Sequence, residues 1–99
     1  MADEIVEAAR DVIGILRAWY LSDREATKRN RIASTARSLQ QALDAMVTFP
    51  KGSDEYLRAN AQAERALNEA SQIMHFNESL APVLGAAASR LRRIKDGRR

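Results

Sequence analysis

Apolar residues recur at every third or fourth position in each long stretch of the chain. Near the start the repeat comprises Ile5, Val6, Ala9, Val12, Ile13, Leu16, Trp19 and Tyr20. At about 100° per residue, this spacing fills one broad side of a helix. The pattern predicts an all-α protein, an up-and-down bundle of three to four helices.

The breaks in the pattern divide a single domain, 1–99, into four expected helices: about 3–21, 23–48, 54–75 and 80–96. The strongest break is Phe-Pro-Lys-Gly at 49–52, because proline disfavours a helical conformation for the residue before it. Ser53 or Asp54 is expected to cap the third helix. Asn77 or Ser79 is expected to cap the fourth, and Pro82 suits its first turn.

The junction between the first two helices allows two interpretations. Ser22 and Glu25 have the Ser-x-x-Glu spacing of a capping box, which would let Ser22 begin the second helix. No glycine or proline forces a break there, so the two segments could also be fused into one helix of about 45 residues.

The third and fourth segments carry narrower apolar stripes. The stripe of the third is mostly alanine and comprises Tyr56, Ala59, Ala63, Ala66, Leu67, Ala70, Ile73 and Met74. Because small side chains permit close approach of a neighbouring backbone, this stripe is expected to pack against the second helix as an antiparallel partner. The stripe of the fourth comprises Leu80, Leu84, Ala87, Leu91 and Ile94.

Composition changes this picture only slightly. The 99 residues carry a formal charge of +3 and no cysteine, so neither disulfides nor thiolate metal sites support a modest core. Oligomerisation, for example as a homodimer, would be the remaining common support. The apolar runs are far shorter than the ~20 residues of a membrane span, and the acidic start is unlike a secretion signal. We therefore expect no membrane partner and a cytoplasmic location.

The apolar arc of the first helix is wider than one neighbour requires, because Ala8 and Ile15 extend it toward Trp19. One interpretation is that this helix is central and packs against two others. The other is that Ile15 and Trp19 form a dimer or partner interface, in which tryptophan is a typical anchor.

Two basic concentrations are candidate binding surfaces. The first follows the first helix and contains Arg24, Lys28, Arg29 and Arg31. Glu25 is expected to pair with Arg29, one helical turn away. These cations either form a solvated turn or contact an anionic partner.

The second basic concentration lies near the end of the chain and comprises Arg90, Arg92, Arg93, Lys95, Arg98 and Arg99. Such a cluster could bind nucleic-acid phosphates without sequence preference. Cations at the carboxyl end of a helix also interact favourably with its dipole, so a purely structural role is the alternative.

Catalytic motifs are missing from the sequence. His75 is the only histidine and has no cysteine to share a zinc ion, and four glycines form no phosphate-binding loop. We expect neither enzymatic activity nor a cofactor.

The sequence thus favours a non-catalytic helical module that binds another protein through Ile15, Trp19 and the first basic concentration. A small regulator, assembly factor or inhibitor, of the kind that phages encode, fits this size. The alternative is nucleic-acid binding by the basic residues of the second helix and the carboxyl-terminal segment.

Overall fold

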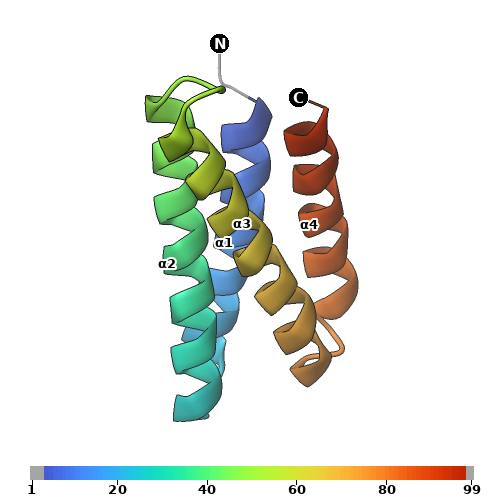
Figure 1. Ribbon diagram of the computed structural model, residues 1–99. Coiled ribbons are helices and arrows are strands. Elements are labelled where there is room, and N and C mark those ends of the chain that lie inside the picture. The colour runs from blue at the N-terminus through green and yellow to red at the C-terminus, as the bar shows by residue number, and fades with distance from the viewer. Residues whose placement is uncertain (1–3, 98–99) are drawn as a thin grey trace.

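The computed structural model describes residues 4–97 and confirms the predicted fold class. It contains the helices α1 (Glu4–Ser22), α2 (Ala26–Thr48), α3 (Asp54–Ile73) and α4 (Ala81–Asp96), and no strand among the described residues. A single 3-10 turn, η1 (Met74–Phe76), follows α3. The helices alternate in direction to form an up-and-down bundle (Figure 1).

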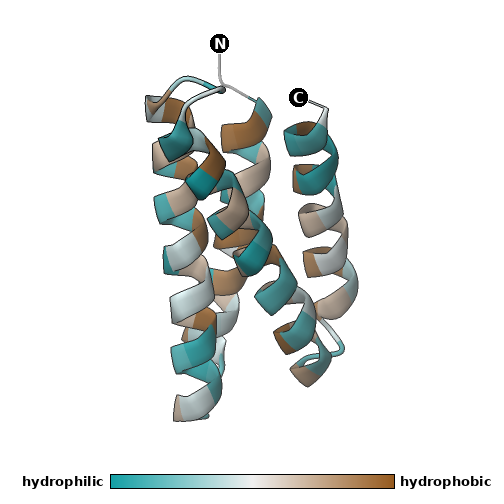
Figure 2. Cartoon of the chain, in the orientation of Figure 1, coloured by the Kyte–Doolittle hydropathy of each residue, from teal (hydrophilic) through white to brown (hydrophobic). Residues whose placement is uncertain are grey.

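Each helix contacts its neighbours around the bundle in the order α3, α2, α1, α4. The backbone of α1 approaches both α2 and α4, while α2 approaches α3. The wide apolar arc of α1 is therefore explained by two neighbours inside the chain, which was the first of the two interpretations. Hydrophilic and hydrophobic positions alternate along each helix (Figure 2), and all four helices contribute apolar residues to the buried core.

The core is built from large side chains on α1 and smaller ones on α3. Its largest fully buried residues are Ile5, Val12, Leu16, Trp19, Ile32, Leu39, Leu67, Ile73 and Leu84. The alanine stripe of α3 is buried where this helix packs against α2, as predicted. In α4 the buried alanine is Ala88, whereas Ala87 is only partly covered.

The junction between α1 and α2 is a real break, but the predicted capping box is wrong. Ser22 is the last residue of α1, and its hydroxyl donates to the Trp19 carbonyl at 3.0 Å. Asp23 supplies the polar contacts instead: one carboxylate oxygen accepts from the Glu25 amide at 2.9 Å, the other from the Trp19 indole at 3.1 Å. Consequently α2 begins at Ala26, three residues later than predicted.

The start of α3 follows the prediction from sequence more closely than the start of α4. Of the two expected caps of α3, Ser53 is the one used, because its hydroxyl oxygen accepts from the Tyr56 amide at 3.2 Å. The expected cap of α4 by Asn77 or Ser79 is wrong, because the residue at its N-cap is Leu80, which makes no side-chain cap. The Asn77 side chain instead accepts from the Leu80 amide at 3.3 Å, before the helix, and Pro82 lies in the first turn as expected. None of the helices within residues 4–97 combines the length and apolarity needed to cross a membrane.

Candidate partner-binding groove

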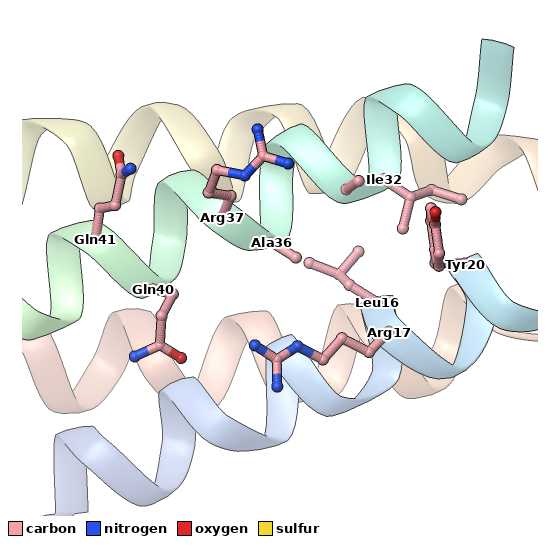
Figure 3. Close-up of a pocket in the computed structure, with 9 residues that line it drawn as sticks. Leu16, Arg17, Tyr20, Ile32, Ala36, Arg37, Gln40 and Gln41 are labelled. Atoms are coloured by element: carbon pink, nitrogen blue, oxygen red, sulfur yellow. The ribbon is translucent and has the colours of Figure 1, made fainter. Parts of the chain in front are cut away.

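A groove of about 280 Å³ lies between α1 and α2 on the outside of the bundle (Figure 3). Residues from both helices line it: Leu16, Arg17 and Tyr20 from α1, and Ile32, Ala33, Ala36, Arg37, Gln40 and Gln41 from α2. The two helices are antiparallel neighbours (Figure 1), and the groove lies beside the last turns of α1 and the middle of α2.

The floor of the groove is apolar, and part of it is formed by small side chains. Leu16, Ile32 and Ala36 are buried beneath it, and Ala33 is half-buried beside them. Because Ala33 and Ala36 each end at a methyl group, α2 leaves room there that a larger side chain would fill. Such a floor permits the close approach of another backbone.

The charged residues that line the groove are both cations. Arg17 projects from α1 and Arg37 from α2, and Leu16 and Ala36 lie between the two helices (Figure 3). Both arginines are exposed, and neither makes an ion pair or hydrogen bond with any residue in the described part of the chain. The amide of Gln40 donates to Asp44 on its own helix at 2.9 Å. No carboxylate lines the groove to balance Arg17 and Arg37.

Tyr20 closes one end of the groove and is held in place from α2. The Arg29 guanidinium lies over its ring at 4.5 Å from the ring centre, a cation–π contact. The Arg29 side chain therefore contacts Tyr20, and the Glu25 carboxylate pairs with Lys28 at 3.2 Å in place of the expected pair with Arg29. The Nε atom of Arg29 is buried and has no hydrogen-bond partner.

The other three contacts between neighbouring helices are each bridged by ions of opposite sign. Arg90 of α4 pairs with Asp11 of α1 at 2.9 Å, and Arg31 of α2 pairs with Glu69 of α3 at 2.6 Å. Glu64 of α3 pairs with Lys95 and lies 3.8 Å from Arg92, both on α4. Within residues 4–97, no ion pair or side-chain hydrogen bond joins α1 to α2.

The two predicted anchors on α1 lie away from this groove. Trp19 is 1% exposed and belongs to the core, so the expectation of a tryptophan at a partner surface does not match its position. Ile15 is half-buried and packs against the core. Both residues are covered because α1 packs against α2 on one side and α4 on the other, and these two helices bury its wide apolar arc.

The first basic concentration is partly used to hold the lower end of the bundle. Lys28 and Arg31 lie over the half-exposed Phe76 ring, at 5.6 and 5.5 Å from its centre. Arg29 contacts Tyr20, as described above. Only Arg24 of this group is exposed without a partner within the described residues.

The carboxyl-terminal basic concentration is also largely paired inside the molecule. Lys95 is 4% exposed, and its ammonium donates to Asn60 at 2.9 Å besides its pair with Glu64. The expectation that Lys95 binds phosphate is therefore wrong: this lysine continues the buried stripe of α4 and meets polar residues of α3.

Of the remaining cations in that concentration, Arg90 pairs with Asp11 and Arg92 donates to Asn68 at 2.8 Å. Arg93 stays exposed, while Arg98 and Arg99, which were also predicted to bind phosphate, lie outside the described residues. The cluster as a whole therefore presents few unpaired cations within the described part of α4.

A larger hollow, of about 450 Å³, lies between the start of α3 and the end of α4. Its charged lining is of both signs, since Lys51 and Lys95 are accompanied by Asp96. Lys95 already pairs with Glu64. The hollow therefore has no excess of positive or negative charge that would attract a charged ligand. Across residues 4–97, no three His, Cys, Asp or Glu side chains are close enough together to hold a metal ion.

The groove residues were missed by the sequence analysis, although a signal for them exists. Arg10 and Arg17 stand seven residues apart on one flank of α1, and Ala33 and Arg37 stand four apart on one flank of α2. Flanks of helices next to an apolar stripe become groove edges when two helices pack side by side. The sequence alone does not say which flanks meet.

Comparisons with protein-family models, with curated proteins and with solved structures found no match to this chain. The groove and its charges are therefore the basis on which a function is inferred.

Proposed function

We propose that this chain is a non-catalytic helical module that binds another protein in the groove between α1 and α2. The observation that carries the proposal is an apolar floor flanked by Arg17 and Arg37 with no carboxylate beside them. Every other interhelical contact in the described bundle has a cation and a carboxylate facing each other. The groove is the place where such a partner is missing.

The shape of the groove supports a protein partner. Two antiparallel helices present a channel whose backbone groups are already hydrogen-bonded within each helix, so contact must be made by side chains. Grooves of this kind bind amphipathic helices through apolar residues on one helix face. A small regulator, assembly factor or inhibitor would act in this way.

Filling the groove tests the proposal. Replacing half-buried Ala33 with leucine adds bulk to the floor and leaves the core below intact. Exposed Ala86 on α4 offers a matched control, Ala86→Leu, with the same change on another face. Circular dichroism should show both variants as helical as the wild type.

The measurement is affinity capture from an extract of the source cells after nuclease treatment. We expect a protein that the wild type and Ala86→Leu retain and that Ala33→Leu loses. Equal retention by both variants would count against the groove. Material that is lost on nuclease treatment would favour nucleic-acid binding, and a second copy of this chain as the retained protein would indicate a homodimer.

A further inference from the structure

The geometry points to an acidic amphipathic helix as the occupant of the groove between α1 and α2. Such a helix would place apolar side chains on the floor and carboxylates beside Arg17 and Arg37. This inference rests on the proposed function, since it names the chemistry of the partner that the groove would bind.

Charge is the first argument. Arg17 and Arg37 belong to different helices, so the two edges of the groove are both positive, and neither edge carries a carboxylate. Exposed Arg10 lies two turns before Arg17 on the same flank of α1 and has no partner within residues 4–97. At the other contacts between helices of this chain, a cation on one helix is paired with a carboxylate on the neighbouring helix. The missing carboxylates are therefore expected on the partner.

The floor is the second argument. Leu16, Ile32 and Ala36 are buried and offer no polar group, so a fully polar ligand would lose water there without replacing its hydrogen bonds. A helix satisfies its own backbone and repeats an apolar residue every three or four positions. The partner must therefore be apolar on one face and acidic at the borders of that face.

Small residues are the third argument. Ala33 and Ala36 allow a third helix to approach the channel between α1 and α2 closely, as helices do when ridges of one pack into grooves of another. Tyr20, held by Arg29, supplies an aromatic wall with a hydroxyl at one end of the channel. Aromatic and arginine residues are the commonest energetic anchors of protein interfaces.

Synthetic helical peptides provide the probe. A peptide of about 14 residues is about 21 Å long and covers the lined part of the groove. Three versions share one leucine stripe and carry glutamate, glutamine or lysine at the bordering positions. Fluorescence anisotropy with the full chain measures their affinities.

We expect the glutamate peptide to bind about tenfold more tightly than the glutamine peptide, with a difference that shrinks at high salt. Arg17→Glu combined with Arg37→Glu should weaken the glutamate peptide about 30-fold and make the lysine peptide the preferred one. The control Arg58→Glu with Arg65→Glu has the same net charge and changes exposed arginines of α3. It should leave the order of the three peptides unchanged.

Two outcomes would overturn the inference: no peptide binds, or the glutamate and glutamine peptides bind equally. Equal binding of the two peptides that is lost in Ala33→Leu would retain the protein-binding groove and reject only its acidic partner. The capture experiment described above tests that groove separately. The acidic partner can thus be rejected while the protein-binding groove is retained.

Discussion

Between α3 and α4, Lys95 and Arg92 both face Glu64, whereas between α1 and α2 Arg17 and Arg37 face no carboxylate. The first contact joins two helices whose backbones approach each other at few places, and long polar side chains span the space. The second joins helices that pack closely through apolar side chains, and its cations remain outside. The same residue types therefore form ion pairs between helices in one place and remain unpaired at the surface in the other.

The largest effect should separate the core from the groove above it. Trp19→Ala removes a side chain that is 1% exposed and should lower the free energy of unfolding by about 3–5 kcal/mol. Tyr20→Ala, at the next position, removes a half-buried groove residue and should cost about 1 kcal/mol. Urea denaturation followed by far-ultraviolet circular dichroism measures both.

Similar losses in these two variants would contradict the division between core and groove. Trp19→Phe provides a milder change if Trp19→Ala does not fold. The glutamate peptide adds a second readout, because Tyr20→Ala should weaken its binding whereas folded Trp19→Phe should not.

The next effect concerns the contact between α3 and α4. Glu64→Ala removes the carboxylate that pairs with the buried Lys95 ammonium and leaves it with weaker partners, such as the neutral Asn60 amide. This change should lower the free energy of unfolding by about 1–3 kcal/mol. Lys95→Met removes the charge itself and fills the same space with an apolar chain, so its stability should stay close to that of the wild type.

Thermal denaturation of both variants makes the comparison. A loss in Lys95→Met as large as that in Glu64→Ala would show that the ion pair stabilises the helices beyond compensating its own burial. Neither change should alter peptide binding, because Glu64 and Lys95 lie outside the groove.

A smaller effect is expected when a carboxylate is supplied to the groove from within. Ala33→Glu places a glutamate one turn before Arg37 on α2, the favourable order for an ion pair along a helix. Stability should rise by about 0.2–0.5 kcal/mol, while the acidic peptide binds more weakly. Ala33→Gln is the matched control for size, and differential scanning calorimetry with anisotropy gives both quantities. Unchanged affinity for the acidic peptide in Ala33→Glu would show that charge does not govern the groove.

The helices could be predicted from the sequence because apolar periodicity and breakers are local signals. The turn at 49–52 and the cap of α3 depend on neighbouring residues only: the turn was predicted, and the cap was predicted to be Ser53 or Asp54. The start of α2 was not, because the sequence offers Ser22 and Asp23 as competing polar groups. Which of the two contacts the backbone before α2 depends on the Trp19 indole, which donates to Asp23 and whose position is set by packing in the core.

The groove could not be predicted because it is a property of two packed helices. Arg17 and Arg37 are twenty positions apart, and their shared edge exists only when α1 and α2 lie side by side. Lys95 illustrates the same difficulty: its position in a basic cluster indicated a phosphate contact, but Glu64 and Asn60 come from another helix.

The smallest effect concerns the turn that joins the two helices of the groove. The Glu25 amide, which donates to the Asp23 carboxylate, lowers the pKa of Asp23 below its ordinary 3.8, and the Trp19 indole and nearby Lys28 and Arg29 act in the same direction. A lowered pKa in the folded chain means that ionised Asp23 favours folding above pH 3.8. This contribution should be lost as the pH falls below 3.8 and through the lowered pKa.

In Asp23→Asn the acid limb of a plot of melting temperature against pH should therefore be flatter than in the wild type, and carboxyl NMR should find Asp23 titrating below 3.8. An Asp23 resonance that titrates at or above that value would contradict the assignment of these hydrogen bonds to the turn.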